Sequence, residues 1–229
     1  MILTRRTIRR TILRSCLLAA TLGAGLAAGP AWAATPGQIA AFFRAVQLDD
    51  ARTVSRMVGK EVNANEINPI GGEPALVLAV REDAMNVFRA LLAHPGTDLE
   101  ARAMNGNTAL MMAAFKRNTP AAVALLEKGA KVNRAGWTPL HYAAASGSDE
   151  IARLLIARKA KLDATSPRAS GAYTPLMMAA REGQPSVAQL LLEAGADPRR
   201  KNTEGLTAAQ IAERAGQTTI AAAISGFKR

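Results

Sequence analysis

Histidine is the first residue type to consider for catalysis in this sequence, because its imidazole exchanges a proton near neutral pH. His141 lies beside a tyrosine in "GWTPLHYAAASGSDE", and His94 lies in the short segment "AHPG". A histidine acts as a general base only when a nucleophile or an orienting acid lies within hydrogen-bond reach. No sequence pattern supplies such partners to His141, so we expect it to have a structural role; a catalytic role is the alternative.

The sequence lacks the common signatures of catalytic and metal sites. It contains no G-x-S-x-G, no H-E-x-x-H and no glycine-rich phosphate-binding loop. Asp49 and Asp50 directly precede "ARTVSRMV", which indicates a helix-capping pair and not an acid–base couple. Two methionine pairs are expected in the core or on the floor of a groove and not in a soft metal site: Met111, Met112, Met177 and Met178. We therefore predict no catalytic residue, no metal and no cofactor.

The first 33 residues have the organisation of a cleavable signal peptide. The segment "MILTRRTIRRTILR" contains five arginines and no acid, and an uncharged stretch rich in Ala, Leu and Gly follows it. Ala31 and Ala33 then match the small-x-small pattern that precedes a cleavage site. The apolar stretch is short for a transmembrane span, so we predict export to the periplasm and a mature chain that begins at Ala34; an uncleaved anchor is the alternative. The segment "IRRTILR" resembles a twin-arginine export signal but has Ile8 where Ser or Thr is usual, which leaves the export route open.

Composition and charge indicate the fold class of the chain and the compartment that suits it. Of the 229 residues, 49% are hydrophobic but only 4% are aromatic, which favours close-packed helices over sheets. The formal net charge of +11 falls to +6 when the five arginines of the signal peptide are removed, because that segment has no acid. The single cysteine, Cys16, leaves with it, so the mature chain forms no disulfide and suits an oxidising compartment. We expect an all-α protein.

A seven-residue motif recurs along the chain and indicates the architecture. The motif "TPLHYAA" at 138–144 recurs as "TPLMMAA" at 174–180, as "TALMMAA" at 108–114 and in weaker forms at 74–80 and 207–213. Successive copies begin 30 to 36 residues apart, and a leucine-rich segment follows each of the first four. Repeats of this length are supersecondary units that bury their apolar faces by stacking on one another.

These residues resemble the ankyrin repeat: a T-P-L-H-x-A-A opening, a glycine nine residues after the threonine, a leucine pair and a G-A-D-x-N ending. The resemblance implies an all-α ankyrin-repeat solenoid of about five to six helix–turn–helix repeats with β-hairpin fingers. It also implies a structural role for His141, whose equivalents here are Met111, Met177, Val77 and Gln210. The predicted domain, 34–229, comprises an N-terminal capping repeat at 37–66, repeats at 67–101, 102–134, 135–164 and 165–200, and a C-terminal capping repeat at 201–227.

The resemblance further implies that a partner protein binds on a concave face built by the first helices and the fingers. The candidate residues precede the threonine or follow the paired alanines: Trp137, Tyr173, Phe115, Asn107, Lys116, Arg181, Glu182 and Arg81. Trp137 and Tyr173 occupy equivalent positions on adjacent fingers, and large aromatic side chains often dominate binding energy. The alternative is that these two rings only pack against each other across the joint between fingers.

Basic residues recur where the second helices are expected to end. They form a predicted basic ridge of Lys128, Lys131, Arg158, Lys161, Arg199 and Arg200. The helix dipole favours cations at these ends; contact with an acidic partner or with anionic lipid headgroups is the alternative. The finger before Thr138 is short and the finger before Thr174 is long, which indicates either an irregular binding face or tolerated loop drift.

These observations predict a non-catalytic protein-binding module of the bacterial periplasm that is a monomer by itself. The chain resembles exported bacterial ankyrin-repeat proteins, some of which are linked to peroxide defence, so stress defence is one expected setting. The alternative is an immunity or inhibitor protein that neutralises a toxin or enzyme in the periplasm. We expect no nucleic-acid partner, because the exported chain has neither stacked aromatics nor a reading motif, and no stable insertion into a membrane.

Overall fold

The computed structural model describes residues 34–228; the predicted signal peptide, residues 1–33, lies outside this part of the chain. Residues 34–228 form twelve α-helices and a 3₁₀ helix at Arg168–Ser170, without a β-strand. The helices come in six successive pairs: α1 (Pro36–Gln47) and α2 (Ala51–Met57), α3 (Ala75–Arg81) and α4 (Met85–Ala93), α5 (Ala109–Phe115) and α6 (Thr119–Glu127), α7 (Pro139–Ser146) and α8 (Asp149–Ala157), α9 (Pro175–Arg181) and α10 (Pro185–Ala194), α11 (Ala208–Arg214) and α12 (Thr218–Gly226).

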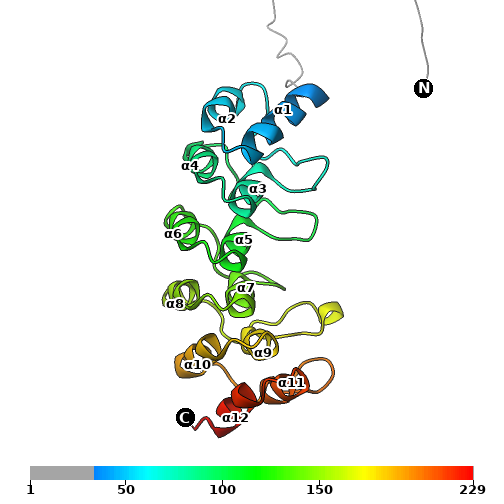
Figure 1. The fold of residues 1–229 in the computed structure, drawn as a ribbon, viewed down its shortest axis with the longest axis vertical. Coiled ribbons are helices and arrows are strands. Elements are labelled where there is room, and N and C mark those ends of the chain that lie inside the picture. Colours follow the sequence, from blue (N-terminus) through cyan, green and yellow to red (C-terminus); the bar gives the residue numbers. More distant parts are fainter. Residues whose placement is uncertain (1–33, 229) are drawn as a thin grey trace, which may run out of the picture. The chain divides into compact units, whose positions relative to one another are not determined.

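The pairs stack in chain order, so that one row contains the first helices and another contains the second helices (Figure 1). Among the first helices, α5 packs on α7, α7 on α9 and α9 on α11. Among the second helices, α6 packs on α8, α8 on α10 and α10 on α12. Each pair therefore depends on its neighbours for burial, as a solenoid requires.

Both rows of helices bury small and large apolar residues in the core. The paired alanines of the repeated motif lie in the first helices and are fully buried: Ala113, Ala114, Ala143, Ala144, Ala179 and Ala180. Branched side chains fill the second helices, where Leu125, Ile151 and Leu155 have no exposed surface. This packing confirms the predicted all-α array of stacked helix–turn–helix units.

The predicted β-hairpin fingers are not confirmed. Loops lead from each second helix to the next first helix, and we keep the name finger for these loops. Isolated backbone hydrogen bonds close them, such as Ala103 N–H to the carbonyl of Asn107 at 2.9 Å and Asn202 N–H to the carbonyl of Leu206 at 3.0 Å. An isolated bond closes a turn, whereas paired strands need a ladder of successive bonds, so no strand forms within the described residues.

The two neighbouring aspartates predicted as a capping pair cap different helices. The side chain of Asp50 accepts a hydrogen bond from Thr53 N–H at 3.0 Å and caps α2, and this bonding lowers the pKa of Asp50. Asp49 instead accepts the N–H of Val87 at 2.8 Å and the side-chain amide of Asn86, both in the first turn of α4. Asp49 thus joins the first helix pair to the second.

Side-chain oxygens connect the fingers of successive repeats in the same way. Each accepts a backbone N–H from the following repeat: Asn65 Oδ1 from Asp98 at 2.7 Å, Glu100 Oε1 from Lys131 at 2.8 Å, Asn133 Oδ1 from Lys161 at 2.8 Å and Asp163 Oδ1 from Asp197 at 3.0 Å. We call this series the oxygen ladder. It satisfies backbone donors that the loops would otherwise leave unpaired.

The turn between paired helices requires one residue with a left-handed backbone. Gly147 and Gly183 supply it with φ of 70° and 72°, nine residues after their threonines. Arg117 occupies the equivalent position in the preceding repeat with φ of 56°. A residue with a Cβ atom adopts this conformation at a steric cost that glycine avoids.

We therefore expect Arg117→Gly to raise the free energy of unfolding by about 0.5–1 kcal/mol, since the steric relief outweighs the added freedom of the unfolded chain. Arg89 is the matched control, because it is also an exposed arginine but lies inside α4. Arg89→Gly should lower the free energy of unfolding by about 1 kcal/mol. Urea unfolding of both variants measures the difference, and a loss of stability in Arg117→Gly would contradict the expectation.

Candidate functional site

Four of the predicted partner-contacting residues line one hollow between the first helices α5, α7 and α9. The hollow has a volume of about 310 Å³, and its lining consists of Phe115, Trp137, His141, Tyr142, Ala145, Met178, Arg181 and Glu182. We call it the aromatic hollow. Phe115 ends α5, Trp137 lies on the finger that precedes α7, and Arg181 ends α9. Residues from three successive repeats therefore meet at this place.

Three rings form the walls of the aromatic hollow. The Tyr142 ring lies 6.3 Å from the ring of Phe115 at an interplanar angle of 87°, and 6.2 Å from the ring of Trp137 at 61°. These edge-to-face contacts are favourable for aromatic pairs. Phe115 is 54% exposed, and the other two rings are half-buried. The hollow thus offers an accessible aromatic surface held in a fixed arrangement.

Asn107 positions one of these rings. The Tyr142 hydroxyl donates a hydrogen bond to Asn107 Oδ1, and burial raises the pKa of Tyr142. Asn107 itself is only 8% exposed, so it has little surface to offer a partner. Sequence reasoning missed Tyr142; the available signal was a tyrosine at a position where the neighbouring repeats have Met112 and Met178.

Tyr173 lies beside the hollow and contacts Arg181. The guanidinium carbon of Arg181 lies over the Tyr173 ring, 5.0 Å from its centroid, and Arg181 pairs with Glu182 at 2.8 Å. Trp137 makes its ring contacts with His141 and Tyr142, and among the described residues no ring contact joins it to Tyr173. The alternative that Trp137 and Tyr173 only pack against each other across the joint between fingers therefore has no ring contact in its support.

Arg81 and Lys116 lie outside the aromatic hollow. Arg81 forms ion pairs with Glu73 and Glu82, each at 2.8 Å. Glu73 is largely buried, and this burial raises its pKa while the charge of Arg81 opposes the rise. Lys116 lines a different hollow, of about 580 Å³, together with residues that include Asp83.

His141 is fully buried beneath the hollow and connects two repeats. Its Nδ1 accepts the N–H of Thr138 at 3.1 Å, which places the ring proton on Nε2, and Nε2 donates to the carbonyl of Tyr173 at 2.9 Å. Burial lowers the pKa of His141 to about 4. The neighbouring Thr138 hydroxyl, 2.8 Å from Nδ1, belongs to a residue with 2% exposure, so no substrate reaches this pair. The geometry supports the structural role.

Residues equivalent to His141 make only one of its two kinds of hydrogen bond, the one that closes the first turn of the helix. Met177 Sδ accepts the N–H of Thr174 at 3.4 Å, and Gln210 Oε1 accepts the N–H of Thr207 at 2.9 Å. Each closes the first turn of its helix, as a capping box does. His141 differs because it also has a donor on the far side of its ring, which reaches the next repeat.

The residues of the basic ridge are all exposed, and they lie at or shortly after the C-terminal ends of successive second helices. Lys128 and Arg158 directly follow α6 and α8. Arg158 also donates to the carbonyl of Leu126 near the end of α6, at 2.9 Å. A cation bonded to a terminal helix carbonyl is what the dipole explanation requires.

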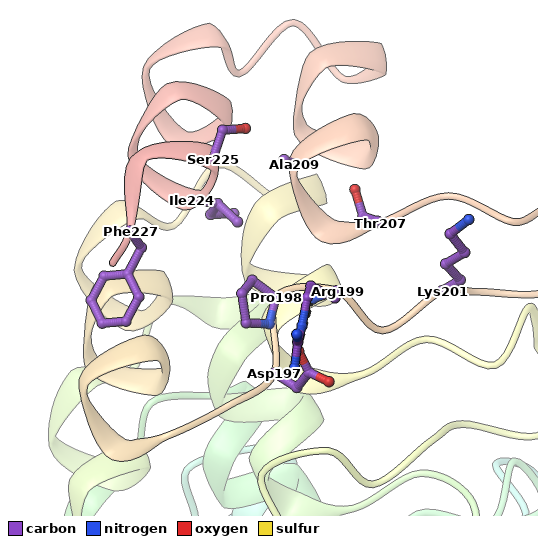
Figure 2. A pocket seen from close by; sticks show the side chains of 9 residues that line it. All are labelled: Asp197, Pro198, Arg199, Lys201, Thr207, Ala209, Ile224, Ser225 and Phe227. Atoms are coloured by element: carbon purple, nitrogen blue, oxygen red, sulfur yellow. Dashed lines mark hydrogen bonds and ion pairs between the residues drawn. The ribbon is translucent and has the colours of Figure 1, made fainter. Parts of the chain in front are cut away.

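A further hollow, of about 730 Å³, lies at the C-terminal end of the ridge (Figure 2). Its lining mixes polar and apolar residues: Asp197, Pro198, Arg199, Lys201, Thr207, Ala209, Ile224, Ser225 and Phe227. Figure 2 shows Phe227 on one side and Lys201 on the other, with Pro198 and Arg199 between them. It contains a single aromatic ring, and Arg199 is paired with Asp197 at 3.1 Å. We therefore place the candidate site at the aromatic hollow.

Sequence reasoning also missed two exposed apolar side chains on the first fingers. Ile70 is 96% exposed and Met104 is 88% exposed. The two fingers touch, since Met104 N–H donates to the carbonyl of Gly72 at 2.9 Å. The signal in the sequence was an apolar residue within the glycine- and asparagine-containing segments "NPIGG" and "AMNGN".

A metal-binding cluster and a membrane-spanning helix are both absent from residues 34–228. In this part of the chain no group of three or more His, Cys, Asp or Glu side chains is arranged to hold a metal ion. No helix in the same part is long and apolar enough to cross a membrane.

Comparison with known proteins gives consistent matches across the repeats. The family model described as "Ankyrin repeats (3 copies)" matches residues 42–135, 76–166 and 133–202. The human SH3 and multiple ankyrin repeat domains protein 1 is 36% identical over 126 residues, which is 53% of this chain and 6% of that protein. The human transient receptor potential cation channel subfamily A member 1 is 34% identical over 115 residues, 49% of this chain and 10% of that protein. The neurogenic locus notch homolog protein 1 of Xenopus laevis is 32% identical over 126 residues, 54% of this chain and 5% of that protein. The matched region therefore spans a tenth or less of each of these relatives.

Proposed function

Because the chain belongs to the ankyrin-repeat family, whose repeats are protein–protein interaction modules, we propose that it is a non-catalytic protein-binding module. The observation that carries this proposal is the aromatic hollow, where Phe115, Trp137 and Tyr142 present accessible rings from two successive repeats. Rigid aromatic side chains in a concave site are the usual anchors of protein interfaces. The partner binds across the first helices at this hollow.

The proposal places the protein in the periplasm after export. Its support is the arrangement of the first 33 residues and the lack of cysteine after Cys16. Stress defence, including defence against peroxide, is the proposed setting, and neutralisation of a toxin or enzyme is the alternative. The captured partner separates the two, because an immunity protein abolishes the activity of the enzyme that it binds.

The test begins with capture of a partner from periplasmic extract and measurement of its affinity for the full chain. Trp137→Ala should weaken binding by at least about 2 kcal/mol, roughly thirtyfold, as truncation of a central aromatic anchor does. Trp137→Phe keeps a ring in the hollow and serves as the matched control, with a smaller loss. Thermal melting of both variants checks folding, since Trp137 also contacts His141.

Charge reversal on the basic ridge tests whether the partner binds there and not at the aromatic hollow. Arg158→Glu and Lys161→Glu should mainly slow association and change its salt dependence, since both side chains are exposed outside the aromatic hollow. Normal binding by Trp137→Ala together with failed binding by the ridge variants would place the site on the ridge and contradict the proposal.

A further inference from the structure

Two arginines at equivalent positions in different repeats differ in how many carboxylates they hold. Arg81 and Arg181 each end a first helix, and each pairs with the glutamate that follows it, Glu82 or Glu182, at 2.8 Å. Arg81 Nη1 also holds the carboxylate of Glu73 at 2.8 Å. Within residues 34–228 no carboxylate pairs with Nη1 of Arg181.

The difference follows from the residue that precedes the motif in each repeat. Glu73 occupies this position in one repeat, and Tyr173 occupies it in the other. The Tyr173 ring lies under the guanidinium of Arg181, which a cation–π contact stabilises. Arg181 is thus held by Tyr173 on one side and by Glu182 on another, while part of its donor fork stays open at the rim of the aromatic hollow.

We propose that the aromatic hollow and Arg181 together bind an exposed segment of the partner protein in which a large apolar side chain lies next to an Asp or Glu. The apolar side chain fills the hollow of about 310 Å³ between Phe115, Trp137 and Tyr142. The acidic side chain pairs with Arg181 as Glu73 pairs with Arg81. This inference rests on the proposed function and adds the chemistry of the partner.

A cationic side chain is the competing occupant, because aromatic rings and a carboxylate together can hold a cation. The arrangement of the rim disfavours it. Both Nε and Nη2 of Arg181 lie 2.8 Å from Oε1 of Glu182, so this carboxylate is already engaged. An incoming cation meets the charge of Arg181, whereas an incoming carboxylate meets an open, oriented donor.

Selection from a displayed library of random peptides, fused at their C-terminal ends, tests the preference directly. The full chain is the target, and peptides that also bind Trp137→Ala are subtracted. We expect the remaining peptides to carry Phe, Trp, Leu or Ile within two positions of Asp or Glu. Enrichment of Lys or Arg in place of the acid, or failure to recover any peptide that depends on Trp137, would overturn the inference.

Titration of the consensus peptide, with an amidated C-terminus, then assigns the acidic side chain to Arg181. Arg181→Gln should weaken binding at least about tenfold, because a charge-assisted pair is lost. Tyr173→Glu should weaken it similarly, because the new carboxylate occupies Arg181 as Glu73 occupies Arg81. Arg81→Gln is the matched control and should bind normally. A peptide with Gln in place of its acid should lose affinity for the wild type but not for Arg181→Gln.

Glu182→Gln separates the two possible occupants by the sign of its effect. The variant should bind the acidic consensus peptide more tightly than the wild type, because a competing carboxylate charge is removed while the amide oxygen can still accept from Arg181. Weaker binding by Glu182→Gln with unchanged binding by Arg181→Gln would indicate a cationic occupant and overturn the inference. Measurements with the natural partner distinguish the two proposals: dependence on Trp137 without dependence on Arg181 contradicts only this inference, whereas independence of Trp137 contradicts the proposed function itself.

Discussion

Acidification from pH 6.5 to pH 4 should remove about 3 kcal/mol of stability through the titration of His141 alone. The pKa of His141 is about 4 in the folded protein, against an ordinary value of 6.5. Between these two values the unfolded chain binds a proton that the folded protein does not, so falling pH favours unfolding. The contribution is fully present above about pH 6.5 and is lost progressively as the pH approaches the folded value. Protonation of Nδ1 would also break its bond with Thr138 N–H.

The measurement is urea unfolding of the wild type and of His141→Gln from pH 4 to pH 8. At neutral pH the variant should be less stable by about 1–2 kcal/mol, because a glutamine closes the first turn, as Gln210 does, but the bond to Tyr173 is lost or weakened. Its stability should then fall less steeply with acid. Met111→Ala retains His141 and is the control for reduced stability as such; it should keep the steep dependence. An equally steep fall in His141→Gln would contradict the assignment.

Leu155→Ala should lower the free energy of unfolding by about 3 kcal/mol, since it leaves a cavity in a fully buried part of the core. Leu155 lies on α8, which packs between α6 and α10, so the cavity weakens contacts with repeats on both sides. The adjacent Leu154 is only half-buried and provides the control. Leu154→Ala should cost clearly less in the same urea or thermal unfolding experiment. Equal losses in the two variants would show that the core of this repeat is not where the structure places it.

The sequence predicts the array of helices well because each copy of the motif repeats the same local physics. Threonine begins a first helix, the alanine pair permits close packing, and glycine provides the left-handed turn, as at Gly147 and Gly183. The fingers are less predictable because their conformation depends on a few backbone bonds and on contacts between repeats. The side-chain oxygen of Asn65, for example, accepts from Asp98 N–H, 33 residues further along the chain, and no local pattern indicates that partner.

The candidate site, like the fold, could be predicted from the sequence only in part. Phe115, Trp137, Arg181 and Glu182 were identified from their places in the motif, and the structure brings them together at one hollow. Tyr142 was missed because its place inside the motif suggested core packing, whereas its ring forms a wall of the hollow and contacts the rings of Phe115 and Trp137. The number of carboxylates that pair with Arg181 could not be inferred either, because it depends on which side chain from the preceding finger reaches the guanidinium.

The oxygen ladder between fingers has a consequence for how such a chain changes in length. Each rung, that is each hydrogen bond of the ladder, joins one acceptor side chain to one N–H donor of the next repeat. The acceptors are Asn65, Glu100, Asn133 and Asp163. A duplicated unit brings its own acceptor and its own donor, so the number of satisfied bonds grows with the number of units. Since amide and carboxylate oxygens serve equally, the rung survives drift in sequence between copies. Gene duplication and loss can therefore lengthen or shorten this protein by whole units, whereas an insertion of part of a unit would leave rungs without partners.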